Sequence, residues 1–342
     1  MTADTRPLIL SCPLPRTLPL IFAPDRLAEL HARYRIVETT DEDLPALPDA
    51  VLAEARYIIG QPPLDEATLS RLAALRCIFN VESNLLNNMP YDRVFARGIH
   101  VVTTGAVFAQ PVAEIGLGFA LSLFRDIHGA DAAFRAGQEK WGGEGNASAR
   151  LLTGADVGII GFGELGRAVA RVLSGFSPRL RIHDPWLPPS RLREAGEPAD
   201  LATVLSQSDV VFCTAAVTSE NRGFLGAEAF ASMRRGAAFL LLSRADVVDF
   251  DALMAAVRSG HILAASDVFP EEPLPADHPV RSIPGFLLSA HRAGALDVAF
   301  KRMGEMVLED LALLDRDLPP MVCKRAERET VARFRSRPVT VN

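Results

Sequence analysis

Residues 156–186 read DVGIIGFGELGRAVARVLSGFSPRLRIHDPW. The run 156–160 is short, apolar and typical of a strand, and three glycines with the spacing G-x-G-x-x-G follow it. A helix is expected next, because apolar residues recur at i, i+4, i+7 and i+8 and therefore share one face. These residues are Leu165, Val169, Val172 and Leu173. A second strand, 180–183, ends at Asp184, so the stretch predicts a dinucleotide-binding unit.

Each glycine has a separate task in such a unit. Gly161 permits the tight turn, Gly163 has no side chain to keep the backbone away from a pyrophosphate, and Gly166 lets the helix pack closely on the strand. The amides at the helix start, including those of Glu164 and Leu165, are expected to face the anion, helped by the helix dipole.

The acid at the end of the second strand indicates which dinucleotide binds. Asp184 lies 23 positions after Gly161, since 184 − 161 = 23. Its carboxylate can accept hydrogen bonds from both ribose hydroxyls and would repel a 2′-phosphate. We therefore expect NAD, in the form NADH for a reduction, rather than NADP.

The composition is that of an ordinary globular protein. With 342 residues the chain is long enough for two domains, and hydrophobic residues make up 49% and charged residues 23%. The net charge of −6 argues against a nucleic-acid partner. The longest mostly apolar run, 115–124, has about ten residues, well short of the roughly 20 that a membrane helix needs, so no membrane partner is expected.

The four cysteines indicate a reducing compartment. Cys12, Cys77, Cys213 and Cys323 are far apart and form no C-x-x-C, so neither a disulfide framework nor a metal site is expected. No signal peptide is expected either, because prolines interrupt the first apolar residues. We expect a cytoplasmic protein. The basic stretch 324–337 is expected to form a solvated helix.

Strands and helices alternate in two sets along the chain. The first set is expected before residue 104, and the second, with six strands, occupies 156–289. A long helix, 111–125 continuing toward 135, and a loop at 141–146 are expected to form the crossing between domains. A last helix, with Asp297 as N-cap and running over 298–314, is expected to return to the first domain. Its apolar face consists of Met303, Met306, Val307, Leu311 and Leu314.

Three polar residues follow late apolar strands, where ligands bind in doubly wound sheets. They are Arg244, Glu272 and His291. Singly, each has a structural explanation: Arg244 could pair with Asp246 or Asp249, Glu272 could be a loop carboxylate, and His291 could be a satisfied histidine. Together they place an arginine, a carboxylate and an imidazole beside a nicotinamide.

The chain resembles the D-isomer-specific 2-hydroxyacid dehydrogenase family over about residues 80–322. The resemblance rests on the glycine turn with Asp184, on SRADVVD (243–249), on DVFPEEPLP (267–275) and on HRAG (291–294). It implies an α/β fold with two doubly wound parallel-sheet domains. A Rossmann NAD-binding domain, 105–294, is then inserted into a flavodoxin-like substrate domain, 1–104 and 295–342.

The resemblance also implies roles for the site residues. Arg244 would bind the substrate carboxylate with its planar fork and polarise the 2-oxo oxygen. His291 would be the general acid in reduction and the base in oxidation, with Glu272 orienting its imidazole. Asp267 would face the nicotinamide. Further cofactor contacts, mostly through the backbone, are expected at Thr214, Ala216, Asn221, Leu242, Ser243 and Gly294.

The substrate side departs from the family pattern. At 81–84, where the family carries a glycine-rich segment whose amides hold the substrate carboxylate, the residues are V-E-S-N. Ser83 and Asn84 could still present amides, although a plain turn would give the same sequence. Phe108 stands where asparagine is common and would add apolar bulk, and Arg292 could add positive charge. These departures concern the size and shape of the substrate.

Three functions remain open. The first is an NAD-dependent enzyme that interconverts a small 2-oxo acid and a D-2-hydroxy acid. The second is a formate or phosphite dehydrogenase of the same superfamily; the formate enzymes pair the histidine with glutamine, so Glu272 counts against it. The third is a non-enzymatic NADH sensor similar to the C-terminal-binding co-repressors. The resemblance further implies a homodimer formed through 111–135 and the loop at Trp141.

Overall fold

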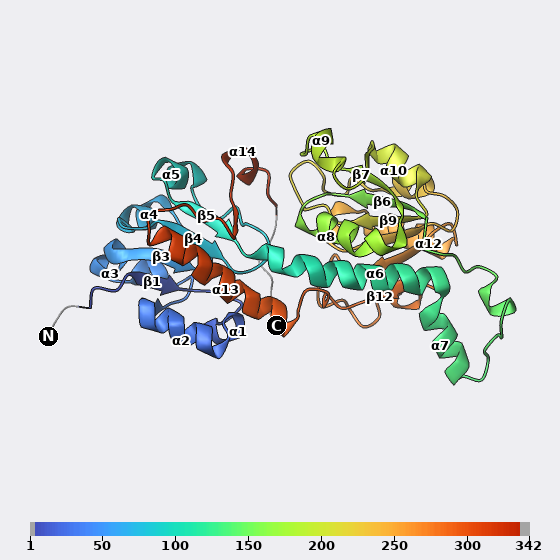
Figure 1. Ribbon diagram of the computed structural model, residues 1–342, viewed down its shortest axis with the longest axis horizontal. Coiled ribbons are helices and arrows are strands. Elements are labelled where there is room, and N and C mark those ends of the chain that lie inside the picture. Colours follow the sequence, from blue (N-terminus) through green and yellow to red (C-terminus); the bar gives the residue numbers. More distant parts are fainter. Residues whose placement is uncertain (1–3, 336–342) are drawn as a thin grey trace. The chain divides into compact units, whose positions relative to one another are not determined.

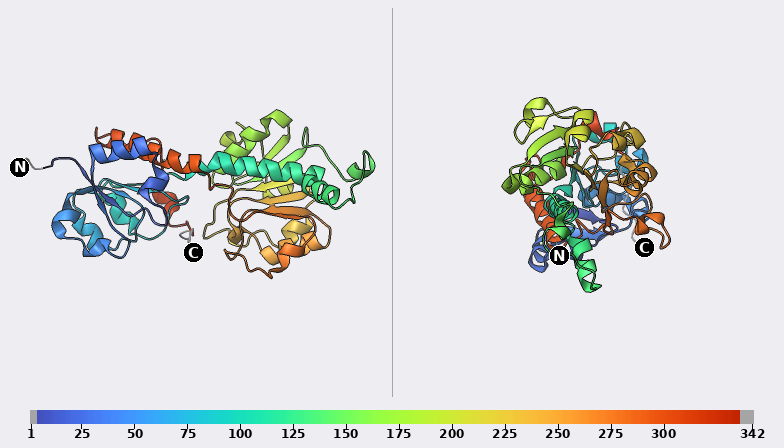
Figure 2. Two further views of the ribbon diagram at one scale, coloured as in Figure 1. Left: turned by 90° about the horizontal axis from the view of Figure 1, so that it is seen from below. Right: turned by 90° about the vertical axis from the view of Figure 1, so that its right-hand side faces the viewer.

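The computed structural model describes residues 4–335, which form two compact units (Figure 1). Unit 1 comprises Met1–Phe108, Thr218–Glu220 and Ala295–Asn342, and unit 2 comprises Ala109–Val217 and Asn221–Gly294. The first boundary, expected after residue 104, falls after Phe108. In each unit, helices cover both faces of one sheet (Figure 2).

Unit 1 contains a six-stranded sheet with the order β13-β5-β4-β3-β1-β2. Strands β1 to β5 are parallel and follow the order 2-1-3-4-5, which is that of flavodoxin-like folds, while β13 runs antiparallel to β5. The strands are β1 (Leu8–Ser11), β2 (Arg35–Glu38), β3 (Ala55–Ile59), β4 (Cys77–Asn80), β5 (His100–Thr103) and β13 (Lys324–Arg325).

Alternate residues of the inner strands enter two separate cores. Ile9, Tyr57 and Phe79 pack on one face of the sheet, and their neighbours Leu10 and Ile58 pack on the other. Strands covered on both faces therefore read as continuous apolar runs. The helices of unit 1 are α1 (Leu18–Ile21), α2 (Pro24–Arg33), α3 (Asp49–Glu54), α4 (Glu66–Arg71), α5 (Tyr91–Ala96), α13 (Asp297–Leu314) and α14 (Arg328–Val331), with 3-10 turns η1 (Leu44–Ala46) and η2 (Gly105–Phe108).

Helix α13 belongs to unit 1, as expected, and its predicted apolar face is buried. Its N-cap is Leu296, and Asp297 is the first helical residue, so the expectation that Asp297 caps the helix is wrong by one position. An acid in the first turn still interacts favourably with the helix dipole, which explains why Asp297 suits either position.

The basic stretch near the C-terminus is not a solvated helix over its described part. After α13, the fully buried Asp310 accepts hydrogen bonds from the backbone amides of Met321 (2.7 Å) and Cys323 (2.8 Å). These hydrogen bonds hold the segment that leads into β13 and α14. Ala326 and Val331 of this region are buried in the unit 1 core. The expectation failed because an edge strand of two residues leaves no periodicity; residues 336–337 lie outside the described part.

Unit 2 contains a seven-stranded parallel sheet with the order β12-β11-β10-β9-β6-β7-β8. Six strands were expected; the seventh, β8, has two residues and extends the edge. The order reverses between β6 and β9, as in dinucleotide-binding folds. The strands are β6 (Asp156–Ile160), β7 (Arg179–His183), β8 (Glu197–Pro198), β9 (Val210–Cys213), β10 (Ala238–Leu241), β11 (Leu263–Ser266) and β12 (Phe286–Leu288).

Helix α6 packs against α8 and β10. A Cβ added at Gly116 would lie 2.6 Å from Leu242 Cδ1, so glycine permits this close approach. The stretch Gly105–Arg125 is long and apolar enough to cross a membrane by composition, but half of it is buried, as in the core helix of a globular domain. The helices of unit 2 are α6 (Ala109–Arg125), α7 (Ile127–Arg135), α8 (Glu164–Leu173), α9 (Pro189–Leu192), α10 (Leu201–Gln207), α11 (Ala227–Ala231) and α12 (Phe250–Arg258), with 3-10 turns η3 (Glu144–Asn146), η4 (Ser174–Phe176), η5 (Ala245–Val247) and η6 (Pro279–Ser282).

The expected single helix from 111 to 135 is broken. Asp126 adopts a left-handed conformation with φ 48°, and α7 begins after it and projects from the sheet of unit 2 (Figure 1). No residue of α7 is buried. Phe134 and Trp141 are exposed, and their rings form an edge-to-face pair with centroids 6.3 Å apart. This exposed apolar segment is called the arm below (residues 127–141).

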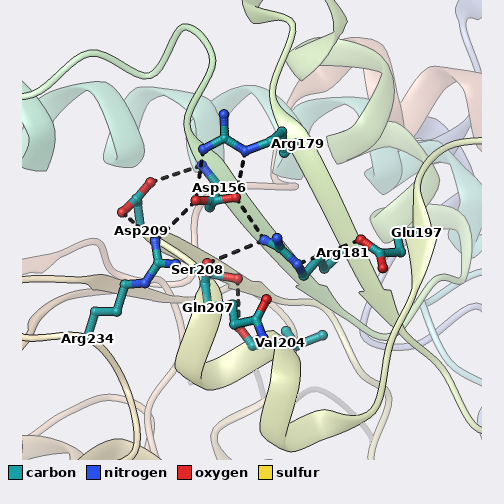
Figure 3. A network of polar contacts seen from close by, with 9 residues as sticks. All are labelled: Asp156, Arg179, Arg181, Glu197, Val204, Gln207, Ser208, Asp209 and Arg234. Atoms are coloured by element: carbon teal, nitrogen blue, oxygen red, sulfur yellow. Dashed lines mark hydrogen bonds and ion pairs between the residues drawn. The ribbon is translucent and has the colours of Figure 1, made fainter.

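A cluster of charges closes the amino-terminal edge of the unit 2 sheet (Figure 3). Asp156 accepts hydrogen bonds from Arg179 Nε and Nη2 (both 2.9 Å), Arg181 Nη1 (2.8 Å) and Arg234 Nη1 (3.2 Å). The backbone amide of Asp156 donates to Asp209 Oδ2 (2.9 Å). The cluster ties β6 to the start of β7 and to the segments that precede β9 and β10.

Candidate active site

The first and third glycines of the turn after β6 are required by the packing of the protein itself. Gly161 has φ 86°, and a Cβ there would lie 2.6 Å from Ala215 Cα. A Cβ at Gly166 would lie 2.3 Å from Gly161 O. Thr214 Oγ1 donates to Gly161 O (2.6 Å), so this predicted cofactor residue holds the turn in shape.

The second glycine has no such requirement. Gly163 is exposed, is the N-cap of α8, and would place a Cβ with no atom within 4 Å. The absence of a side chain there leaves backbone amides of the first helical turn accessible, which suits a pyrophosphate. Arg167, which the sequence reading did not single out, donates to Phe162 O (3.0 Å) and to the Glu164 carboxylate (2.7 Å), and so balances the negative charge of Glu164. The turn therefore fits a dinucleotide.

Asp184 is held beside this turn. Its Oδ2 accepts from the amide of Phe162 (2.7 Å) and its Oδ1 from the amide of Trp186 (2.9 Å). A carboxylate oxygen accepts more than one hydrogen bond, so both oxygens keep capacity for ribose hydroxyls. The half-buried side chain is thus oriented by the backbone of the glycine turn.

The other predicted cofactor residues follow β9, β10 and β12. Asn221 Nδ2 donates to Ala216 O (2.7 Å), so the two shape one loop. Leu242 and Ser243 are buried, and Ser243 Oγ has no hydrogen-bond partner among residues 4–335. Gly294 is half-buried at the end of unit 2. Leu165 is half-buried in the first turn of α8.

Arg244, Glu272 and His291 follow three neighbouring strands, β10, β11 and β12. The carboxyl ends of parallel strands meet at one edge of the sheet. His291 Nδ1 lies 2.5 Å from Glu272 Oε2, and each side chain is 34% exposed, so the pair can reach a ligand. Arg244 is half-buried, and its Nη1 donates to Ser243 O (2.7 Å).

Glu272 is ionised at neutral pH. Burial raises the pKa of its carboxyl, but the hydrogen bonds from His291 and from the Phe269 amide (2.8 Å), together with the charges of His291 and Arg244, outweigh burial and hold the pKa below its ordinary value. A charged carboxylate therefore faces the imidazole and accepts a hydrogen bond from its Nδ1.

The backbone that carries the histidine is clamped. His291 has φ 47°, a conformation that few residues other than glycine adopt. Asp267, only 2% exposed, accepts from the amides of Arg292 and Ala293 (both 3.0 Å). Asp267 thus fixes the turn from which the imidazole projects; its approach to a nicotinamide stays a prediction. The Arg292 side chain is exposed.

The predicted substrate residues Ser83, Asn84 and Phe108 lie in unit 1. The loop after β4 folds back on Asn80, whose Nδ2 donates to Asn84 O (3.1 Å) and whose Oδ1 accepts from the Glu82 amide (3.1 Å). Glu82 is buried, while Ser83 and Asn84 are half-buried. The segment is therefore an ordered turn.

Arg16 lies against this loop and was not singled out from the sequence. Its Nε donates to Val81 O (2.8 Å), and its guanidinium carbon lies 4.7 Å from the ring centroid of Phe300 and 5.5 Å from that of Phe108. The two rings pack edge to face at 6.3 Å. The only sequence signal was an arginine among prolines directly after β1.

A cavity of about 620 Å³ opens at the carboxyl edge of the unit 1 sheet. It lies where the strand order reverses between β1 and β3, the usual ligand position in such folds. Residues that follow four strands, β1 to β4, line it, together with the end of the described chain. They include Cys12, Gly60, Gln61, Val81, Glu82, Phe334 and Arg335.

Comparisons with known proteins agree with this geometry. The sequence pattern described as "D-isomer specific 2-hydroxyacid dehydrogenase, NAD binding domain" matches residues 117–293. A glyoxylate reductase of Thermofilum pendens is 33% identical over 237 residues, 67% of this chain and 69% of that protein. A D-3-phosphoglycerate dehydrogenase of Mycobacterium leprae is 29% identical over 307 residues, 86% of this chain and 57% of that protein. The crystal structure of a phosphoglycerate oxidoreductase from Rhizobium etli superposes with a TM-score of 0.88 at 68% identity, covering 95% of this chain and 100% of that one.

Two doubly wound units, one carrying an open glycine turn and a carboxylate–imidazole pair at the same edge of its sheet, define an oxidoreductase that uses a nicotinamide dinucleotide. The chain belongs to the D-isomer specific 2-hydroxyacid dehydrogenase family. The resemblance, the fold class and the expectation of an enzyme are thereby confirmed.

Proposed function

We propose that the protein uses NADH to reduce a small 2-oxo acid to the D-2-hydroxy acid. The observation that carries the proposal is the 2.5 Å contact between His291 Nδ1 and Glu272 Oε2, at the sheet edge that also presents Arg244 and the open turn at Gly163. A sensor needs only the turn, whereas a reductase also needs a group that delivers a proton.

Each residue then has a defined task. When bound at the glycine turn, the dinucleotide supplies the hydride. Arg244 holds the substrate carboxylate and polarises the 2-oxo oxygen. Because His291 Nδ1 donates to Glu272, its Nε2 is the atom that holds the proton for the 2-oxo oxygen. Asp267 keeps the imidazole in position through the backbone, and Ser83 and Asn84 contribute to substrate binding.

The substrate class follows from the family. The names of the relatives point to glyoxylate and to phosphoglycerate as acids of this class. Hydroxypyruvate and phenylpyruvate are 2-oxo acids of the same kind with a longer substituent.

A substrate panel tests the proposal. NADH consumption should follow addition of glyoxylate, hydroxypyruvate or phenylpyruvate. Turnover with formate or phosphite instead would favour a formate or phosphite dehydrogenase. The charged Glu272 argues against that function. If NADH binds and no acid is turned over, the sensor function replaces the reductase.

The preference for NADH over NADPH is proposed to rest on Asp184. Asp184→Asn keeps a hydrogen-bond acceptor for the Phe162 amide but removes the charge that repels a 2′-phosphate. The NADH-to-NADPH ratio of kcat/KM should fall by about tenfold or more, since close like charges cost more than 1.4 kcal/mol. The ratio is measured with the best acid of the panel; an unchanged ratio would assign the preference to another residue.

We also propose a cytoplasmic homodimer that buries the arm. Four free cysteines, all buried, suit a reducing compartment. Phe134 is 60% exposed and Trp141 74%, an unusual exposure for paired aromatic rings. The wild-type protein should have the mass of a dimer by light scattering, and Phe134→Glu with Trp141→Glu should give a monomer. Met321→Glu, at a residue in unit 1 that is 72% exposed, is the control and should leave the mass unchanged. A monomeric wild type contradicts the proposal.

A further inference from the structure

Arg16 combines a fixed position with unused hydrogen-bonding capacity. It lies in the segment after β1, at the carboxyl edge of the unit 1 sheet, where ligands bind in this topology. Three contacts hold its guanidinium: the Val81 carbonyl and the rings of Phe108 and Phe300. A guanidinium held in this way has already lost its rotamer freedom, so a ligand binds it at little further entropic cost.

Most donors of this guanidinium are free. The guanidinium of arginine has five N–H groups, and within residues 4–335 its only hydrogen bond in Arg16 is the one from Nε to Val81 O. Burial lowers the pKa of Arg16, although the charge of Glu82 acts in the opposite direction. A half-buried cation without a hydrogen-bonded anion is unfavourable, and an anion at its Nη groups would recover that free energy.

The neighbouring loop offers a substrate carboxylate only part of its backbone donors. It has no glycine at 81–84, and the Glu82 amide is already bonded to Asn80 Oδ1. A carboxylate at this loop would therefore gain from a charged side-chain donor next to the loop. Arg16 is hydrogen-bonded to Val81, the first residue of the loop. Its planar guanidinium presents two Nη groups, which can bind the two oxygens of a carboxylate.

We propose that Arg16 is a substrate-binding residue whose Nη groups bind the carboxylate of the 2-oxo acid and replace the amides of the missing glycine-rich segment. The inference rests on the proposed function, since it concerns the substrate of the same reaction. Its alternative is a purely structural clamp that joins the segment after β1 to Phe108 and Phe300.

Three variants separate the two roles. Arg16→Lys keeps a cation over the rings but loses the fork, and Arg16→Ala removes both. The control is Arg56→Gln: this arginine also stacks on a ring of unit 1, 5.9 Å from the Tyr57 centroid, but lies at the start of β3, on the opposite edge of the sheet. Measured quantities are KM and kcat for the best acid, the dissociation constant of NADH, the inhibition or binding constant of oxamate, and Tm.

A substrate-binding role predicts that Arg16→Lys raises KM and the oxamate constant together, by roughly 10- to 100-fold. Its kcat, NADH affinity and Tm should stay near those of the wild type. Added guanidinium should lower the KM of Arg16→Ala toward the wild-type value. Arg56→Gln should leave KM and the oxamate constant unchanged.

A clamp predicts a different pattern. If Arg16→Lys and Arg16→Ala lower Tm while KM and the oxamate constant stay within about twofold, the proposal is overturned although the reductase function stands. If the wild type reduces no acid of the panel, the proposed function fails on its own, and oxamate binding measured by calorimetry still decides the role of Arg16.

Discussion

Replacing His291 with asparagine is expected to lower kcat for the reduction by roughly 10²- to 10⁴-fold, because a positioned general acid contributes about that factor. Asparagine is the suitable replacement, since it tolerates the left-handed conformation that His291 adopts at φ 47°. The hydrogen bonds from Arg292 and Ala293 to Asp267 involve the backbone and should survive. The decrease in kcat then reflects the loss of proton transfer and not a rearrangement of the turn.

The measurement is steady-state kinetics with NADH and the best acid of the panel. NADH binding, followed by fluorescence, should be unchanged, because the glycine turn is untouched. His31→Asn, at an exposed histidine of α2, should keep full activity. A kcat for His291→Asn within about threefold of the wild type would remove His291 from the reaction.

Glu272→Gln tests the pairing within the same site. The pKa of Glu272 lies below its ordinary value, so the residue is a carboxylate throughout the neutral range. Reduction requires a proton on the imidazole, and glutamine removes the charged acceptor that holds Nδ1 as a hydrogen-bond donor. The kcat of the reduction should therefore fall by about tenfold or more. An unchanged kcat would show that Glu272 takes no part in proton transfer.

Asp156→Asn is expected to lower the free energy of unfolding by about 2 to 3 kcal/mol at neutral pH. The substitution leaves three arginines, Arg179, Arg181 and Arg234, around a neutral amide (Figure 3). The three ion pairs are lost, and the positive charges of the arginines then repel one another. The Asp156 side chain is only 10% exposed, so water screens this repulsion little. Denaturant unfolding of variant and wild type measures the difference. An equal midpoint and slope would show that the cluster contributes nothing.

The pH dependence of this effect has a definite sign. The hydrogen bonds from Arg179 and then from Arg181 and Arg234 outweigh burial and hold the pKa of Asp156 well below its ordinary value. A depressed carboxyl pKa means that the stabilisation is complete above about pH 4, the ordinary pKa, and is lost as pH falls toward the folded value. The gap between wild type and variant should therefore shrink in acid. Glu194→Gln, which breaks an exposed pair with Arg191, is the control and should cost about 0.5 kcal/mol or less.

Local signals were sufficient for the larger part of the fold. Strand β6 lies at the predicted residues, 156–160, because a short apolar run that leads into a glycine turn has few alternative structures. The glycine turn and the apolar face of α13 also follow from spacing alone. The pairing of Glu272 with His291 was implied by the family resemblance, and the structure brings the two together at the shared carboxyl edge of neighbouring parallel strands.

Other features have no local signal. Asp126 looks like any helical residue, yet its left-handed conformation ends α6 and frees the arm. Strand β8 has two residues, too few to show a period. Arg167 reads as a surface charge of α8, but contact with Phe162 O and Glu164 brings it to the glycine turn.

By itself, the sequence determined the alternation of strands and helices and the dinucleotide turn, because these depend on residue spacing within short segments, and the motifs around Glu272 and His291 identified the candidate proton-transfer pair through the family resemblance. Only the tertiary structure decided which polar groups already form hydrogen bonds within the protein and which still have donors available for a ligand. Asp267 is bonded to the backbone behind His291, and the Glu82 amide is bonded to Asn80. Arg16, brought by folding against Val81 some 65 positions away, keeps its Nη donors unused within the described chain. Hydrogen bonds of this kind form between residues that are distant in sequence, so no pattern along the chain reveals them.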